Sequence, residues 1–350
     1  MKHVMIMAGG TGGHVFPGLA VAAELEKRQH KVSWMGTHSG IEARLVPAHG
    51  IPLRYIDIAG VRGKGLAGLL LAPWRIAHAF FQSLAILRQE RPDCLLGMGG
   101  FVAGPGAIAG KCLGIPLVIH EQNAIAGTTN RLLARLANRV LQAFPGALSA
   151  AGKVLTVGNP VRENLPHKND GDIGDRPLHL LVLGGSLGAK ALNDVMPEVM
   201  RILVSSVDIR HQAGNKQIDN VAADYRAMPQ VSVSAFIDDM ADAYQWADLV
   251  LCRAGAMTVS EIAAVGLPAI FVPYPHAIDD HQTANANALV KAGAAIVIQQ
   301  AQMTAADLAA TIDRLNQDRV LLQEMAAKAA AAGIRDAASQ VADNCLEVAR

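Results

Sequence analysis

A histidine follows four glycines near the start of the chain, in the stretch MAGGTGGHVFPG (residues 7–18). An apolar run precedes the glycines, and a helical pattern with Pro17 at about its first position follows them. Glycine amides at the start of a helix form a pocket for anions. An uncharged imidazole beside such a pocket can take a proton from an attacking hydroxyl. We therefore predict an anion-binding loop and a candidate general base, His14.

Two common nucleotide-binding loops do not fit these glycines. A GxGxxG loop requires a third glycine where Val15 stands, and a Walker loop requires a GK[ST] sequence that is missing. The stretch GGSLGAK (184–190) fails both tests as well. The structural alternative is that the glycines only allow a strand and a helix to pack closely. Two such loops in equivalent places favour anion binding over that alternative.

Three more stretches lie where predicted strands end, at the edge where open α/β sheets bind ligands. They are GMGGFVAGPGAIAG (97–110), VIHEQNAIAG (118–127) and CRAGAMTVSEIAAVGLP (252–268). In the last stretch, Thr258 and Glu261 have the spacing of a capping box, which is a structural role. The functional alternative is that this helix start receives a phosphate while Glu261 accepts hydrogen bonds from a ribose diol.

Metal-binding motifs are incomplete in these stretches. An HExxH site beginning at His120 would need a second histidine where Ala124 stands. The DGD sequence at 170–172 matches the DxD pattern of metal-dependent sugar transferases, but it lies in a predicted linker and we discount it. We expect no required metal or other cofactor, and leave open whether a divalent cation stimulates the reaction.

Short apolar runs alternate with helical patterns along the 350 residues, which is typical of α/β proteins with parallel sheets. Residues 92–100 resemble 247–255, residues 114–119 resemble 266–271, and the two first glycine loops correspond in the same order. We interpret this as a duplicated Rossmann-like unit. The Pro-, Asp- and Gly-rich segment 158–178 predicts a linker. It divides the chain into domains 1–158 and 159–335, and a last helix at about 336–350 is expected to cross back to the first domain.

Charge is unevenly divided between the two halves. Residues 1–157 contain 16 Lys and Arg against 7 Asp and Glu, a net charge of +9, and the remaining 15 and 23 give −8. Residues 62–88 combine bulky apolar side chains (Leu69 to Leu71, Trp74, Phe80 and Phe81) with flanking cations (Arg62, Lys64, Arg75 and Arg88). Pro73 and Arg75 interrupt the run, so we expect an interfacial membrane surface rather than a span. An ordinary buried helix is the alternative.

Other features narrow the class of protein. No CxxC pair occurs among the four cysteines, which we interpret as reduced core residues of a cytosolic protein. The chain enters a strand pattern directly, and we expect no signal peptide. Nucleic-acid binding is not expected, because aromatic residues make up only 4% of the chain and do not interleave the glycine loops.

Taken together, eight stretches resemble the MurG family of bacterial glycosyltransferases over about residues 3–300. They are MAGGTGGHVFPGLAVA, GMGGFVAGPG, HEQNAIAGTTN, VGNPVR, GGSLGA, FIDDM, CRAGAMTVSEIAAVGLPAIFVP and DHQTANA. The resemblance implies a GT-B fold, in which two Rossmann-like domains with parallel sheets face each other across a cleft. It implies an inverting transferase that moves N-acetylglucosamine (GlcNAc) from UDP-GlcNAc to the C4 hydroxyl of lipid I, the undecaprenyl-pyrophosphate-linked MurNAc-pentapeptide. The product is lipid II of peptidoglycan synthesis.

The resemblance also implies roles for individual residues. His14 and Glu261 are the predicted catalytic residues, with Glu261 on the ribose. Thr11, Gly12, Gly13 and Asn123 would line the cleft, Arg162 and Ser186 would approach the diphosphate or sugar, and Ile237 would meet the uracil. The nucleotide would be spanned by Ala256, Met257, Thr258, Val259, Ser260 and Glu261, and Gln282 would bond the sugar hydroxyls.

The same resemblance predicts where the protein acts and with what. The N-terminal domain would hold lipid I, and the C-terminal domain would hold UDP-GlcNAc. The protein would be peripheral on the cytoplasmic face of the inner membrane, bound to its anionic surface. It would serve cell-wall biogenesis, cell shape and division beside other cell-wall synthesis proteins.

Three other functions compete with this interpretation. Another UDP-sugar enzyme of the same fold, such as a UDP-GlcNAc 2-epimerase or a natural-product glycosyltransferase, would need no lipid acceptor. A non-catalytic UDP-sugar sensor would have no need of His14. An NAD-dependent dehydrogenase is disfavoured because both glycine loops depart from GxGxxG.

Overall fold

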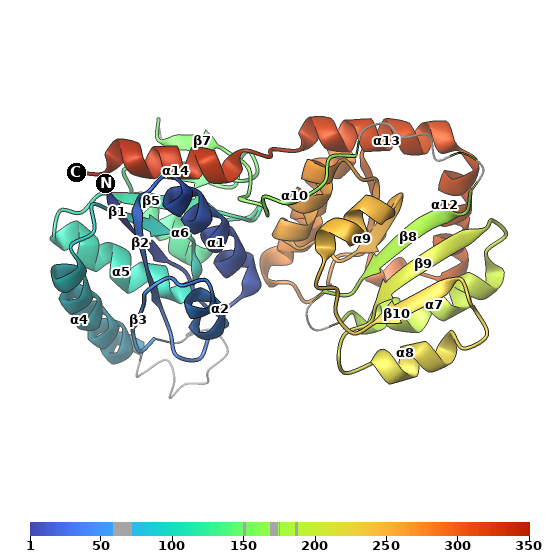
Figure 1. The fold of residues 1–350 in the computed structure, drawn as a ribbon, viewed down its shortest axis with the longest axis horizontal. Helices are drawn as coiled ribbons and strands as arrows, with labels where there is room; N and C mark the ends of the chain where they lie inside the picture. Colours follow the sequence, from blue (N-terminus) through green and yellow to red (C-terminus); the bar gives the residue numbers. More distant parts are fainter. Residues whose placement is uncertain (59–71, 150–151, 169–173, 175, 186–187) are drawn as a thin grey trace. The chain divides into compact units, whose positions relative to one another are not determined.

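The computed structural model describes residues 1–58, 72–149, 152–168, 174, 176–185 and 188–350. The chain forms two compact units, one made of Met1–Arg162 with Arg335–Arg350 and the other of Glu163–Ile334 (Figure 1). The first unit therefore extends past the boundary predicted after residue 158 and includes Arg162. The reason is local: the 157–162 segment is bonded to the first sheet, where the Val157 N–H donates to the Gln142 carbonyl and the Asn159 amide donates to the Gln122 carbonyl.

In the described part of the first unit, parallel strands form one sheet in the order β3-β2-β1-β4-β5-β6-β7. The strands are β1 (His3–Met7), β2 (Lys31–Gly36), β3 (Leu53–Tyr55), β4 (Cys94–Gly97), β5 (Leu117–Glu121), β6 (Arg139–Gln142) and β7 (Val154–Thr156). The helices are α1 (Gly12–Lys27), α2 (Glu42–Ala48), α4 (Ala72–Glu90), α5 (Gly100–Cys112), α6 (Thr128–Leu133) and α14 (Ala337–Val348). Every residue of β1 is buried, as expected for a central parallel strand covered on both faces.

The described residues of the second unit repeat this plan, with parallel strands in the order β10-β9-β8-β11-β12-β13. The strands are β8 (Leu178–Leu183), β9 (Val207–Gln212), β10 (Val231–Ser234), β11 (Leu249–Cys252), β12 (Ala269–Phe271) and β13 (Ala295–Val297). The helices are α7 (Lys190–Ile202), α8 (Ile218–Asp224), α9 (Met240–Trp246), α10 (Ala256–Val265), α11 (His281–Lys291), α12 (Ala305–Gln317) and α13 (Arg319–Ala332), with 3-10 turns η1 (Ile278–Asp280) and η2 (Gln300–Gln302).

Both sheets reverse their strand order at corresponding places. In the first unit the reversal lies between β1 and β4, and in the second it lies between β8 and β11. The similar stretches 92–100 and 247–255 contain the corresponding strands β4 and β11. Ligands of open α/β sheets bind outside the carboxyl ends of the strands at such a reversal. The topology thus places the glycine-rich loops after β1 and β8 where binding is expected.

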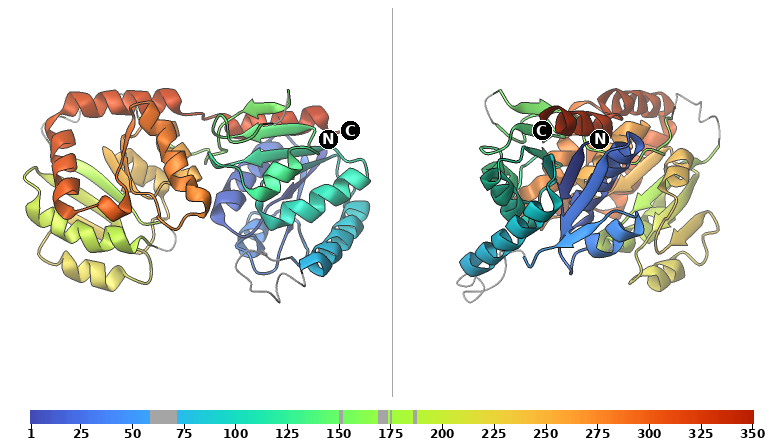
Figure 2. Two further views of the ribbon diagram at one scale, coloured as in Figure 1. Left: turned by 180° about the vertical axis from the view of Figure 1, so that it is seen from behind. Right: turned by 60° about the vertical axis from the view of Figure 1, so that its left-hand side comes forward.

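The final helix α14 packs on the first unit, against α1 and β4. Arg28, the residue that follows α1, forms an ion pair with Asp343 and donates to the Ser339 hydroxyl. The two chain ends lie side by side, where Lys2 donates to the Arg350 carbonyl (Figure 2). The crossing back predicted for this helix is therefore fixed by polar contacts as well as by the buried Cys345.

Two local expectations are wrong. Helix α1 begins at Gly12, so Pro17 lies inside the helix and not at its first position. Proline has no N–H, and the Gly13 carbonyl therefore loses its usual partner one turn later. Cys112 is exposed, because it ends α5 on the face away from the core, whereas Cys94, Cys252 and Cys345 are buried as expected.

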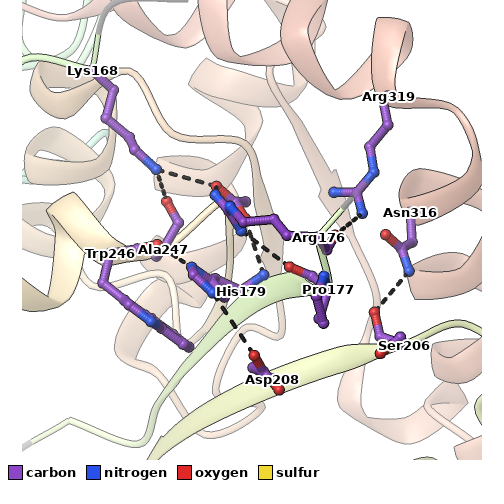
Figure 3. Close-up of polar contacts among 11 residues, drawn as sticks. Lys168, Arg176, Pro177, His179, Ser206, Asp208, Trp246, Ala247, Asn316 and Arg319 are labelled. Carbon is purple, nitrogen blue, oxygen red and sulfur yellow. Dashed lines mark hydrogen bonds and ion pairs between the residues drawn. The ribbon is translucent and has the colours of Figure 1, made fainter. Parts of the chain in front are cut away.

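A buried carboxylate, Asp248, ties the segment before β8 to the second sheet, and its partners Lys168, Arg176 and His179 are labelled in Figure 3. Asp248 is 4% exposed and accepts two hydrogen bonds from the Arg176 guanidinium, at 2.6 and 2.9 Å. It also accepts the His179 N–H at 3.0 Å and lies 3.4 Å from the Lys168 ammonium. Burial alone would raise the pKa of Asp248, but these donors and charges outweigh it and hold the pKa below the ordinary value. Arg176 is the stronger partner, because its two hydrogen bonds are shorter than the 3.4 Å contact of Lys168.

We expect Asp248→Ala to lower the free energy of unfolding by about 1–3 kcal/mol, because it leaves the His179 N–H and the half-buried Lys168 ammonium without their carboxylate acceptor. Since folding depresses the Asp248 pKa, its contribution is present above the unfolded value of about 3.9 and is lost as the pH falls through the folded value. Urea unfolding at pH 7 and in acid measures both effects. The exposed Asp224→Ala is the control, and an equal loss in both variants would contradict the prediction.

Candidate functional site

The glycine loop of the first unit is held from below by a carboxylate that sequence reasoning missed. Glu42, the first residue of α2, is fully buried. It accepts the Gly10 N–H at 3.0 Å, the Thr37 N–H at 2.9 Å and the Thr37 hydroxyl at 2.7 Å. Gly9 makes room for it, since a Cβ there would lie 2.6 Å from Glu42 Oε1. Three converging donors need an acceptor with several lone pairs, which a carboxylate provides.

His14 lies in the first turn of α1, half-buried above this loop. Its Nδ1 is 3.2 Å from the Thr11 hydroxyl. The imidazole rests against the loop after β4, where a Cβ on Gly99 would come within 3.1 Å of Nε2. Gly99 and Gly100 have φ of +96° and +76°, a conformation that favours glycine. The structure thus brings together His14 and the stretch beginning at residue 97, which the sequence predicted separately.

The pKa of His14 is lowered from its ordinary value, because burial disfavours the charged imidazolium. The negative charges of Glu121 and Glu42 oppose this effect, and so does a hydrogen bond with the Gly9 backbone. The net shift leaves the imidazole uncharged at neutral pH. An uncharged imidazole is the form that can accept a proton.

The HEQN stretch ends β5 and turns into α6 around a second buried carboxylate, Glu121. Its Oε1 accepts the Asn123 N–H at 3.0 Å, and its Oε2 accepts the Gly127 N–H at 3.1 Å and the Asn130 amide at 3.0 Å. The predicted site residue Asn123 is therefore fixed by its neighbour two positions earlier. His120 is fully buried against the Gly158 carbonyl at 2.8 Å, and burial lowers its pKa to about 4. Both ring nitrogens lie within hydrogen-bond distance of groups in the protein interior, the Gly158 carbonyl and the Gln122 side-chain amide.

The predicted residues of the first half gather at one edge of the first sheet. Thr11, Gly12, Gly13 and His14 follow β1, and Asn123 follows β5. Arg162, which the predicted boundary assigned to the donor domain, belongs to this unit, and its guanidinium lies 5.8 Å from the centre of the Phe16 ring. The structure therefore assigns Arg162 to the unit that contains His14.

Predicted donor residues of the second unit lie on the loops and helices after β8, β10, β11 and β12. Ser186 lies outside the described residues. Beside it, the Gln212 side-chain amide donates to the Gly185 carbonyl at 3.1 Å, and a Cβ on Gly184 would meet the Gln212 carbonyl at 2.9 Å. The loop after β8 therefore lies close to the end of β9, as a glycine-rich loop allows and a bulkier one does not.

Helix α10 carries the stretch from Ala256 to Glu261 that is predicted to bind the nucleotide. It begins after Gly255, which makes no side-chain cap, and Thr258 lies inside the helix. The capping box predicted from Thr258 and Glu261 is therefore wrong. Glu261 is instead 7% exposed and accepts a hydrogen bond from the Tyr244 hydroxyl at 3.0 Å. Its partner comes from α9, which no local spacing could indicate.

Two further predicted residues flank this helix. Ile237 is half-buried on the loop between β10 and α9, beside the 54% exposed Phe236. Gln282 lies in the first turn of α11, and its Oε1 accepts the Tyr274 N–H at 2.9 Å. Asp279 and Asp280 enter this helix with φ of +53° and +49°, a strained conformation for residues with side chains. Among the described residues no group of three His, Cys, Asp or Glu is arranged to hold a metal ion.

Comparison with known proteins agrees with this geometry. Profiles described as the glycosyltransferase family 28 N-terminal and C-terminal domains match residues 4–142 and 179–341. The chain is 53% identical over 352 residues to the UDP-N-acetylglucosamine–N-acetylmuramyl-(pentapeptide) pyrophosphoryl-undecaprenol N-acetylglucosamine transferase of Azotobacter vinelandii, covering 99% of each. The crystal structure of Acinetobacter baumannii MurG is 43% identical with a TM-score of 0.86, covering 99% of this chain and 100% of that one.

These matches confirm the predicted GT-B fold of two Rossmann-like domains. A UDP-GlcNAc 2-epimerase from Neisseria meningitidis has a TM-score of 0.70, with 99% of this chain and 100% of that chain covered, but it is only 14% identical. That likeness shows the fold alone. It does not favour epimerase activity for this chain.

We expect Glu42→Ala to lower the free energy of unfolding by about 3 kcal/mol or more, because it leaves the buried N–H groups of Gly10 and Thr37 unpaired. Urea unfolding measures the loss. Glu26→Ala, an exposed carboxylate on α1, should change stability by less than about 0.5 kcal/mol. If the two variants unfold alike, Glu42 does not hold the loop.

Proposed function

We propose, on the premise that this chain belongs to glycosyltransferase family 28, that it transfers GlcNAc from UDP-GlcNAc to the C4 hydroxyl of lipid I and forms lipid II. The observation that carries the proposal is the uncharged His14 at the edge of the first sheet, among two glycine-rich loops and two buried carboxylates. The relatives' shared name supports the donor and the acceptor class. An epimerase has no use for a lipid acceptor.

The second unit holds the donor in this proposal. Glu261 on α10 accepts hydrogen bonds from the ribose, and Ile237 meets the uracil through its backbone. The N-terminal residues of α10 lie where the second sheet reverses its strand order, so their N–H groups and the helix dipole suit a diphosphate. Gln282 at the start of α11 bonds the sugar hydroxyls. The N–H groups and dipole of α10, together with Arg162, stabilise the negative charge of the departing UDP. The proposal therefore requires no resident metal.

The first unit holds the acceptor and supplies the base. The C4 hydroxyl oxygen attacks the anomeric carbon of GlcNAc from the face opposite UDP, and its proton passes to the His14 imidazole. The new glycosidic bond forms as the bond from the anomeric carbon to the UDP oxygen breaks. One displacement inverts the configuration, so an α-linked donor gives a β-1,4 product. The N–H groups of the loops after β1 and β4 lie on the same sheet edge and suit the acceptor diphosphate.

Part of the first unit suits the surface of an anionic membrane. Helix α5 packs between α4 and α6, and apolar side chains are exposed on all three. They are Trp74 at 74% and Phe81 at 65% on α4, Ile108 on α5, and Leu132 at 61% on α6. Beside α6 a cavity of about 560 Å³ is lined by Arg131, Arg135 and Lys153. Apolar side chains with nearby cations favour interfacial binding to anionic lipid.

The predicted membrane surface at 62–88 is only partly described, since residues 62–71 lie outside the described ranges. Helix α4 buries one side, through Ala79, Ser83 and Leu87, and exposes Trp74 and Phe81 on the other. Phe80 packs against the core, contrary to the expected exposure. In the described part of the chain no helix has the length and hydropathy to cross a membrane. We propose a peripheral location on the cytoplasmic face of the inner membrane, near other cell-wall synthesis proteins, with a role in cell shape and division.

We expect His14→Ala to lower kcat by about 10²–10⁴-fold, the usual contribution of a general base, with little change in KM for UDP-GlcNAc. Because burial lowers the His14 pKa, the wild-type acidic limb of kcat/KM should fall below pH 6.5, the ordinary imidazole value. Radiolabel transfer to extracted lipid I measures both. The exposed His49→Ala serves as the control, and near-wild-type turnover without His14 would remove it from the mechanism.

We expect the double variant Trp74→Ser, Phe81→Ser to weaken binding to phosphatidylglycerol vesicles by about 10-fold or more, because it removes apolar area that would enter the interface. Vesicle sedimentation measures the binding. Val204→Ser with Val320→Ser removes exposed apolar side chains from the second unit instead and should have little effect. Equal binding of both double variants would place the membrane surface elsewhere.

A further inference from the structure

Tyr244 is a buried residue that no step of the proposed reaction uses. It lies on the short helix α9 with 1% of its surface exposed. Its hydroxyl donates to Glu261 Oε2 at 3.0 Å, across from α9 to α10. A buried phenol requires a partner, and a carboxylate is the strongest acceptor that a side chain offers.

The contact links the two segments that the proposed donor site needs. The Ile237 loop leads directly into α9, and Asp239 caps that helix by accepting the Asp242 N–H at 3.0 Å. Glu261 lies on α10, which follows the next strand β11. The Tyr244 hydroxyl is therefore a direct connection between the helix that follows the uracil loop and the carboxylate assigned to the ribose.

A glutamate side chain has three rotatable bonds, and fixing them before the ligand arrives removes an entropic cost from binding. A hydrogen bond to one carboxylate oxygen restricts the rotation of the whole group. Because Glu261 is 7% exposed, few alternative orientations are open to it once that bond forms. The bond therefore determines how the carboxylate is presented to a diol.

We propose that Tyr244 is a positioning residue for the donor nucleoside: its hydroxyl orients the Glu261 carboxylate toward the ribose diol and couples uracil recognition to ribose recognition. The inference rests on the proposed ribose role of Glu261. It adds a residue that touches no substrate but sets the affinity for a uridine nucleotide over its deoxyribose counterpart.

The test compares Tyr244→Phe with wild type on two donors, UDP-GlcNAc and its analogue with a 2′,3′-dideoxyribose. We expect KM for UDP-GlcNAc to rise about 5- to 20-fold while kcat changes less than about 2-fold. The dideoxy donor should show no further loss in the variant, because it lacks the hydroxyls that Glu261 accepts. The double variant Tyr244→Phe, Glu261→Ala should bind UDP-GlcNAc as tightly as the single variant Glu261→Ala, because Tyr244 acts only through Glu261.

Tyr225→Phe is the matched control. Tyr225 is 4% exposed in the same unit, and its hydroxyl is bonded to another buried side chain, His211 Nδ1, at 3.1 Å. Like Tyr244→Phe, the Tyr225→Phe variant loses one buried hydroxyl, so the two should be destabilised to a similar extent. Tyr225→Phe should leave KM unchanged for UDP-GlcNAc and for the dideoxyribose donor. Thermal unfolding of the two variants shows that any loss specific to Tyr244→Phe is not general destabilisation.

The other outcomes separate the inference from the function on which it rests. If Glu261→Ala raises KM for UDP-GlcNAc but Tyr244→Phe does not, the positioning role is overturned and the ribose role stands. If Tyr244→Phe weakens both donors equally, the residue is structural and the inference is overturned. If Glu261→Ala itself leaves KM unchanged, both fall, although transfer to lipid I continues to report the transferase activity.

Discussion

Buried carboxylates that accept several donors at once hold the loops and helices at the strand ends of both units. Within a parallel sheet, neighbouring strands satisfy each other's backbone groups. Buried N–H groups in the loops at the strand ends have no such partner and need other acceptors. Glu42 accepts three donors below the first glycine loop, and Glu121 does the same for the HEQN turn. At the edge of the second sheet where the strands begin, Asp248 accepts hydrogen bonds from Arg176 and from the His179 N–H at the start of β8. Each carboxylate turns a set of unsatisfied donors into a defined loop.

The same acceptors shape the chemistry. In the first unit, Glu42 and Glu121 place negative charge near His14 and oppose the lowering of its pKa by burial. An imidazole that is uncharged at neutral pH suits the proposed removal of a proton from a sugar hydroxyl. In the second unit, Glu261 accepts a hydrogen bond from the Tyr244 hydroxyl. Its proposed role is to bind the ribose and not to transfer a proton.

The two units have corresponding strand orders, but they differ in net charge and in exposed apolar side chains. The first half carries the positive charge and exposes large apolar side chains on α4, α5 and α6, a combination that supports the proposed binding to an anionic membrane. The second half is acidic, with a net charge of −8. An acidic surface is repelled from anionic lipid, so the charge division itself favours binding to the membrane through the first unit.

Local patterns predicted most of the fold, whereas most of the candidate site residues were implied by the resemblance to a known family. Buried parallel strands read as apolar runs, and glycines at strand ends mark tight loops, so the two Rossmann-like units, the glycine loops and His14 could be predicted from neighbouring residues alone. Only the tertiary structure decided what lies far apart in sequence: Glu42 is 32 residues from Gly10, and Tyr244 is 17 from Glu261. The capping box failed because α10 already begins at Ala256, which places Thr258 inside the helix and not at its start. Arg162 belongs to the first unit because its segment bonds to strands laid down earlier in the chain, a contact that composition does not record.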